Sequence, residues 1–163
     1  LGSIFLKPAH LTKEEDFDAT LDINLKSSFL ILKKSVPIMR KNGGSILFLS
    51  SAAANIGLVN HEAIAAAKAG VEGLVKSAAA TYSKNNIRVN AIALGLVESN
   101  LSKNIFSNDI SLEISRKMHS IGRVGTPQNV SKFAIPLIAD NSSWITGSVI
   151  NIDGGLSTTK IAS

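Results

Sequence analysis

Three short apolar runs stand out along the chain, each bounded by glycine, serine or other polar residues. They cover residues 45–50 (SILFLS), 87–93 (IRVNAIA) and 148–152 (SVINI). Runs of this length, with little polar alternation, are typical of strands that are buried on both faces of a parallel sheet. We therefore expect three strands here, with helices in the longer segments around them.

The segment before the first run has the charge order of a long helix. Residues 13–42 carry three acidic residues in the first turn and several Lys and Arg residues near the end, ahead of Gly43 and Gly44. This order suits the helix dipole, and a glycine is a common stop signal. We expect one helix over residues 13–42, with Thr12 as its N-cap and Pro37 bending its last turn.

Three further helical segments are expected. Residues 61–84 form the second long helix of this prediction, and residues 98–120 form a variable helical region. Residues 127–139 form a helix that begins with Thr126 and Pro127, because proline suits the first helical turn. The helix over residues 61–84 should pack closely on its neighbour because it is rich in small residues, namely Ala65, Ala66, Ala67, Ala69, Gly70 and Gly73.

Helices that alternate with apolar strands predict an α/β fold with a parallel sheet. The 163 residues are the length of one domain, and they contain no repeat, linker or low-complexity stretch. We therefore expect a single domain over residues 1–163.

Composition excludes several classes of protein. The chain is 45% hydrophobic and 18% charged, and no apolar run approaches the about 20 residues of a membrane span. The N-terminus has no secretory signal pattern, so we expect a cytoplasmic protein with no membrane partner. The chain has no cysteine, and its histidines lack the i, i+4 spacing of a helical zinc site, so no metal is expected.

The formal charge of +5 could indicate an anionic partner such as nucleic acid. The densest basic group ends a predicted helix, where cations favour the dipole, and no aromatic residues interleave with it. We expect a solvated face and no nucleic-acid partner. This group consists of Lys33, Lys34, Arg40 and Lys41.

Ligands of open parallel sheets bind at the carboxyl ends of the strands, so the residues just after each strand are the candidate site. These are Ser50-Ser51, residues 95–99 and Asp153-Gly154-Gly155. The last is expected to be a turn in which glycine supplies positive φ, and not a metal site. None of the three has the glycine-rich turn between strand and helix that holds a dinucleotide, and three strands leave unpaired edges. More sheet must therefore come from elsewhere.

The order of segments resembles the short-chain dehydrogenase/reductase family. The similar segments are LDINLKSSF, ILFLSS, AAAKAGVEGL, IRVNAIALG, GRVGTPQNV and ITGSVINIDGG. The resemblance implies a Rossmann-like, doubly wound parallel sheet and an oxidoreductase that moves a hydride between NAD or NADP and a small alcohol or carbonyl substrate. It also implies a homodimer or homotetramer assembled through the helices of residues 13–42 and 61–84.

The family uses an Asn, a Ser, a Tyr and a Lys, and three of them have counterparts here. By this resemblance, Asn24 would hold a water in a proton relay and Ser51 would hydrogen-bond the substrate oxygen. Lys68 would contact the nicotinamide ribose and lower the pKa of the neighbouring phenol. Taken singly, Ser51 could instead end a strand, Lys68 could be a solvated lysine and Asn24 could be a buried amide bonded to backbone.

The cofactor positions that the resemblance implies are Lys68, Gly95, Val97 and Ser99. Val97 and Ser99 match the backbone and hydroxyl positions that face the nicotinamide amide. Leu94 stands where a proline commonly precedes the glycine, so the loop is expected to be looser.

The tyrosine position, four residues before the lysine, is Ile64. Isoleucine has no exchangeable proton and cannot act as acid or base. Tyr82 lies about 27 Å further along the same helix at 1.5 Å per residue and cannot substitute within one subunit. His61 shares a helix face with Ile64 and is a possible replacement, although we favour the interpretation that His61 and Glu62 simply begin the helix at the surface.

The resemblance also places Gly2 at the last glycine of the family's Asn-Ala-Gly segment. The strands and helices before it, with the glycine-rich turn, are then expected to be absent from this chain. Three hypotheses remain. The first is an NAD(P)-dependent oxidoreductase with altered proton transfer, and the second is a catalytically silent protein of the same fold that acts in binding or assembly. The third, which we favour least, is an assembly of incomplete subunits with exposed sheet edges and no specific ligand.

Overall fold

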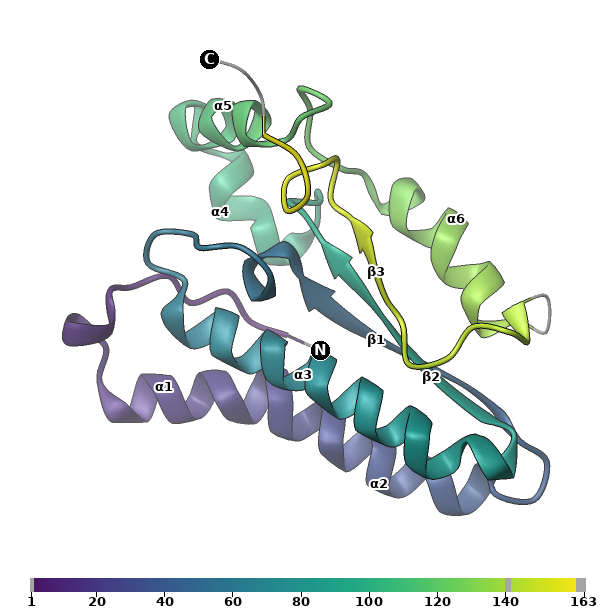
Figure 1. Cartoon of the computed structure of the whole chain (residues 1–163). Coiled ribbons are helices and arrows are strands. Elements are labelled where there is room, and N and C mark those ends of the chain that lie inside the picture. Colours follow the sequence, from purple (N-terminus) through teal and green to yellow (C-terminus); the bar gives the residue numbers. More distant parts are fainter. Residues whose placement is uncertain (1, 140–141, 161–163) are drawn as a thin grey trace.

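The computed structural model describes residues 2–139 and 142–160 and contains a three-stranded parallel sheet. Strand β1 (Gly44–Ser51) pairs with β2 (Ile87–Leu94), which pairs with β3 (Val149–Ile152), in the order β1-β2-β3 (Figure 1). The register aligns Gly44 with Ile87 and Ser51 with Leu94, so the carboxyl ends of β1 and β2 are level. The α/β fold with a parallel sheet is confirmed.

Helices lie against both faces of the sheet (Figure 1). On one face, α3 (Glu62–Tyr82) covers β1 and β2, with α2 (Ser27–Met39) beside it. Their apolar side chains form the core with Phe48 and Val89. On the other face lies α6 (Pro127–Ile138), whose Leu137 carbonyl accepts a hydrogen bond from the Ser45 hydroxyl at 3.0 Å.

Burial differs among the strands in a way that the apolar runs do not reveal. The central strand β2 is buried on both faces, as expected. In β1, however, Leu49 is 49% exposed, so the expectation of burial on both faces is wrong for this strand. Strand β3 is not buried on both faces either, because Asn151 is exposed and its other residues are half-buried. Both are outer strands of the described sheet and pair on one side only.

The expected helix over residues 13–42 is three segments. Helix α1 (Glu14–Leu21) and α2 are joined by a π-helical segment, η2 (Asp22–Lys26). Thr12 is not the N-cap: that position is Lys13, and the Thr12 hydroxyl donates to the Pro8 carbonyl at 3.0 Å. The hydroxyl bonds backwards into the short 3-10 turn η1 (Ala9–Leu11), which sequence spacing alone did not indicate.

The close packing expected of the second long helix is confirmed at Gly70. A Cβ atom built there would lie 2.8 Å from Cδ2 of Leu25 in η2, which is too close for a side chain. At Gly73 the Cβ would meet nothing within 4 Å, so that glycine has no such role. Helix α3 therefore approaches the π-helical segment through one small residue.

The remaining elements fill the predicted variable region and the turns. Residues 98–120 hold the 3-10 turn η5 (Asn100–Ser102), α4 (Lys103–Phe106) and α5 (Asp109–Met118). Helix α6 begins at Pro127 after a capping box between Thr126 and Asn129, as expected. Two further 3-10 turns, η3 (Ala52–Ala54) and η4 (Ser83–Asn85), follow β1 and α3.

Candidate active site

A cavity of about 520 Å³ opens at the carboxyl ends of β1 and β2. Ser51, Ile64 and Gly95 line it, so three of the positions singled out from the sequence meet there. Helix α5 and residues 58–61 form other parts of its wall. Its size is that of a small-molecule site.

Ser51 ends β1 and also caps the turn that follows. Its Oγ accepts a hydrogen bond from the Ala53 N–H at 3.2 Å, which fixes the side chain beside the cavity. Among the hydrogen bonds between described residues, the Ser51 hydroxyl accepts this one and donates none. Its proton is therefore available to an acceptor in the cavity.

The ammonium of Lys68 points back to the sheet. Its Nζ donates a hydrogen bond of 2.9 Å to the backbone carbonyl of Leu49 in β1. Desolvation by burial lowers the pKa of Lys68 from its usual value of 10.5. Lys68 is thus partly buried and bonded to the sheet.

Asn24 lies in the π-helical segment and is 2% exposed. Its Nδ2 donates to the Thr20 carbonyl at 3.0 Å and to the Ser3 hydroxyl at 2.9 Å, and its Oδ1 accepts from the Ser3 N–H at 3.2 Å. All these partners belong to the chain itself, which agrees with the interpretation of a buried amide. Asn24 does not line the cavity.

Ile64 and His61 both face the cavity from the start of α3. Ile64 is buried, and it supplies an aliphatic wall where a phenol would stand. His61 is the N-cap residue of α3, and its Nδ1–H donates to the Val59 carbonyl at 2.7 Å, so its second nitrogen, Nε2, is left for other partners. Tyr82 is the last residue of α3, where it packs against the core.

The loop after β2 is held by backbone pairing on one side. Gly125 N–H donates to the Leu96 carbonyl at 2.8 Å, and Glu98 N–H donates to the Gly125 carbonyl at 3.0 Å. The Val97 carbonyl accepts from the Ser102 hydroxyl at 2.7 Å. Ser99 is the N-cap of η5, and its hydroxyl is engaged in that capping box. The loop is thus well fixed, although Leu94 replaces a proline and a looser loop was expected.

His119 holds this loop through a hydrogen bond to the Leu96 N–H. It was not singled out from the sequence. It is 3% exposed, its Nε2 accepts the Leu96 N–H at 3.1 Å, and its Nδ1–H donates to the Ser115 carbonyl at 2.6 Å. A Cβ atom at Gly95 would lie 2.6 Å from His119 Nε2, so a glycine is required there. No spacing in the sequence indicated this contact, which joins residues 23 positions apart.

A buried carboxylate behind Ser51 was also missed. Glu72 of α3 is 7% exposed, and its Oε1 accepts from the Ser50 hydroxyl at 2.6 Å and from Asn55 Nδ2 at 3.0 Å. These bonds tie the helix that carries Lys68 to both ends of the turn after β1. The only sequence signal was an acidic residue within an otherwise apolar helix face.

The third strand end is a turn, as expected. Asp153 accepts the Gly155 N–H at 3.0 Å and the Ser157 N–H at 3.0 Å, and φ is +60° at Gly154 and +82° at Gly155. Within residues 2–139 and 142–160, no group of three His, Cys, Asp or Glu side chains could hold a metal ion. No helix in that part of the chain is long and apolar enough to cross a membrane.

Known proteins resemble this chain over most of its length. A family model described as enoyl-(acyl carrier protein) reductase matches residues 2–157. The 3-oxoacyl-(acyl-carrier-protein) reductase FabG of Thermotoga maritima is 39% identical over 145 residues, which are 88% of this chain and 58% of that protein. The chain thus spans little more than half of this relative's length.

Two solved structures carry the same fold and hold nicotinamide nucleotides. A 4-hydroxyisoleucine dehydrogenase complexed with NADH has a TM-score of 0.93 at 28% identity, covering 98% of this chain and 67% of its own. ElxO with NADP bound has a TM-score of 0.89 at 28% identity, covering 96% of this chain and 64% of its own. The Rossmann-like architecture is therefore confirmed.

Proposed function

The chain belongs to the short-chain dehydrogenase/reductase family, and from this premise we propose that it forms the substrate-side part of an NAD(P)-dependent oxidoreductase. The reaction would move a hydride between the nicotinamide nucleotide and a small alcohol or carbonyl compound. The observation that supports it is the meeting of Ser51 and Gly95 at one cavity. Lys68 does not line this cavity, and its ammonium is bonded to Leu49, two residues before Ser51 in β1. We also propose that residues 1–163 act as one domain.

The residues present fit the nicotinamide end of such a cofactor. Lys68 provides a donor next to the β1 edge. The Val97 N–H donates to none of the described residues, whereas the N–H groups of Leu96 and Glu98 both donate. A free N–H of this kind suits a carboxamide oxygen. When bound, the nicotinamide supplies or accepts the hydride. The pyrophosphate and adenosine would have to be held by a glycine-rich turn, which these residues do not provide.

In this proposal the Ser51 hydroxyl binds the substrate oxygen, because its proton is available and it faces the cavity. Lys68 holds the ribose. Asn24 acts through its backbone, since its side chain is occupied by Thr20 and Ser3. Its carbonyl accepts a bond of 3.4 Å from the Ser28 hydroxyl, and in this proposal the same carbonyl holds the relay water.

Proton transfer is the atypical step. Ile64 cannot exchange a proton, so the proton must come from water or from His61, whose Nε2 is not engaged by the Val59 carbonyl. His61 is the weaker of the two candidates because it sits as the N-cap residue of α3. Isoleucine at position 64 also supports the alternative function, which is a catalytically silent protein that binds a ligand or assembles with partners.

We also propose a homo-oligomer that forms through α2 and α3. Large apolar side chains of α2 are exposed, with Ile38 81% exposed and Phe29 51% exposed. Such side chains on an outer helix suit a face shared by two copies of the chain.

The deciding experiment titrates NADH and NADPH into the purified protein and follows nucleotide fluorescence, with intact mass measured on the same sample. We expect saturable binding of one nucleotide, and slow oxidation of it when a carbonyl compound is added. Binding without any turnover would favour the silent alternative. Absence of nucleotide binding would contradict the oxidoreductase.

A further inference from the structure

The cavity beside Ser51 has a lining without formal charge. No Lys, Arg, Asp or Glu is among the described residues that line it, and most of the lining is aliphatic. Pockets hold ligands mainly through apolar contact and use a few polar groups to fix orientation. A charged ligand would lose its hydration here without an opposite charge from Lys, Arg, Asp or Glu to replace it.

Both departures from the family's motifs lie in this same cavity. Ile64 stands at the phenol position and Leu94 stands at the proline position, and each lines the wall. Each places an aliphatic side chain where the motif has a polar or a rigid one. The two positions are 30 residues apart in the sequence, and both present aliphatic side chains to one surface; at Ile64 the change also removes a polar hydroxyl.

The rim of the cavity exposes further apolar groups. Ile4 is 41% exposed, Leu6 42%, Ile114 56% and Met118 40%, and all four line the cavity. An occupant that covers this apolar surface would gain binding free energy, at about 25 cal/mol per Å² of apolar area removed from water. The rim residues come from two segments that are far apart in the sequence, so an occupant would contact both.

The Ser51 hydroxyl is the hydrogen-bond donor at the end of β1 in this cavity, and Asn60, His61 and Ser111 place further polar side chains in the lining. The Ser51 hydroxyl is held by Ala53 and keeps its proton for an external acceptor. We propose that the cavity takes an uncharged, largely apolar molecule with a single carbonyl oxygen, which the Ser51 hydroxyl binds. That this molecule is the substrate rests on the proposed oxidoreductase function.

The test uses 6-propionyl-2-dimethylaminonaphthalene, an uncharged aryl ketone whose emission shifts to the blue in apolar surroundings. We expect saturable binding to the protein, displacement by 2-decanone and no displacement by gluconate. Ile114→Glu should weaken binding at least about tenfold, because it buries a charge under the ligand. Ser51→Ala should weaken binding about fivefold through loss of one hydrogen bond.

Ile110→Glu is the matched control, since Ile110 lies one turn away on α5, is 75% exposed and does not line the cavity. It should leave the affinity for the ketone unchanged. No binding of the ketone, equal effects of the two glutamates, or equal displacement by gluconate would overturn the inference.

Nucleotide titration on the same samples separates the two proposals. Ketone binding with the expected pattern but without nucleotide binding rejects the oxidoreductase and keeps the apolar site. Nucleotide binding and turnover, without the expected effects on ketone binding, would keep the oxidoreductase and reject the apolar site. If another segment of the polypeptide filled the cavity, the ketone would not bind. That outcome would also count against the inference.

Discussion

The ammonium of Lys68 donates a hydrogen bond to the carbonyl of Leu49, 2.9 Å away, and burial disfavours its charged form. The pKa of Lys68 is therefore lower in the folded chain than its usual 10.5. Between the folded pKa and 10.5, the unfolded chain binds more protons than the folded chain. The contribution of Lys68 to the free energy of unfolding thus rises with pH through this window and is least favourable below it.

Lys68→Met tests this relationship. The difference in free energy of unfolding, wild type minus variant, should increase from pH 7 toward pH 10 in urea denaturation. Lys76→Met is the control, because Lys76 lies exposed on the same helix. Parallel pH curves for wild type and Lys68→Met would contradict the lowered pKa of Lys68.

Ile64→Tyr should raise turnover of carbonyl compounds. The phenol would enter the cavity one helical turn before Lys68, where its proton can reach a substrate oxygen. General acid catalysis supplies about 100-fold or more, so kcat should rise by about that factor. Ile64→Phe adds the ring without the hydroxyl, and it should not raise kcat. Equal rates for the two variants would show that proton transfer is not the limiting step.

His119→Ala should release the loop after β2. The Leu96 N–H would lose its acceptor, and the variant should lose about 1–3 kcal/mol in free energy of unfolding. Hydrogen exchange at the Leu96 amide, measured by NMR, should become faster while the amides of β2 stay protected. The exposed His10, changed to Ala, serves as the control. Unchanged exchange at Leu96 would mean that the loop is fixed by Gly125 alone.

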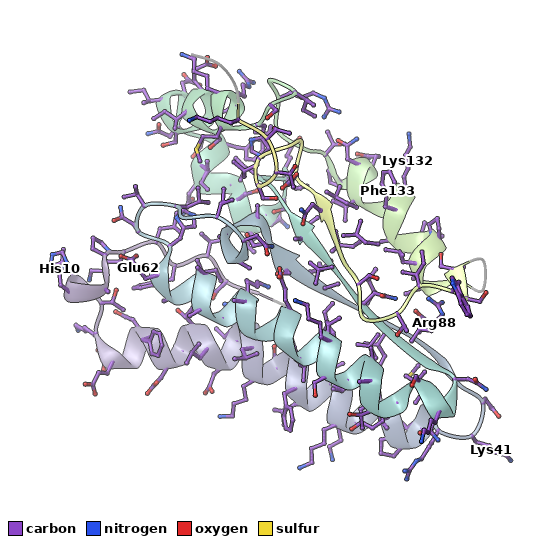
Figure 2. All side chains as sticks on the ribbon, in the orientation of Figure 1. His10, Lys41, Glu62, Arg88, Lys132 and Phe133 are labelled. Atoms are coloured by element: carbon purple, nitrogen blue, oxygen red, sulfur yellow. The ribbon has the colours of Figure 1, made fainter. Side chains whose placement is uncertain are left out.

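Arg88→Lys should weaken the attachment of α6 to the sheet. Figure 2 labels Arg88 near the end of α6, where its guanidinium donates to the carbonyls of Leu137, Ala139 and Ile145 at 3.0–3.2 Å. Lysine keeps the charge but cannot reproduce this fork, so we expect a loss of about 1–3 kcal/mol in free energy of unfolding. Thermal unfolding should show no comparable loss for Arg40→Lys, whose side chain is exposed.

Phe29→Glu should reduce the oligomeric state. A charge on the exposed apolar side of α2 would be buried between two copies of the chain and would oppose their association. Light scattering at micromolar concentration should show a smaller particle for this variant and no change for Ile110→Glu on α5. A wild-type monomer under these conditions would reject assembly through α2 and α3.

The strands could be predicted within one or two residues because each is a continuous apolar run between polar boundaries, and β2 is apolar on both faces. The family order of motifs also located Ser51, Ile64 and Gly95, which meet at one cavity. Local patterns explain these successes, since each depends on neighbours in the sequence or on known spacing.

Contacts between distant segments could not be predicted in the same way. The bond from Leu96 to His119 and the bonds from Ser50 and Asn55 to Glu72 join residues that only the folded chain brings together. The π-helical segment was missed for another reason. Its residues have ordinary helical propensities, and what distinguishes it is a hydrogen-bond pattern that no composition reveals.

That segment has a consequence for inserting or deleting residues in this chain. A π-helical turn takes up an extra residue while α1 and α2 continue along nearly one axis (Figure 1). Each residue of a regular helix advances the chain by about 100°, so counting faces continuously from Glu14 to Met39 misplaces one half by about that angle. Loss of one residue within Asp22–Lys26 could be absorbed by a return to regular helix, whereas loss of one residue within α2 would turn the apolar side of that helix away from the sheet.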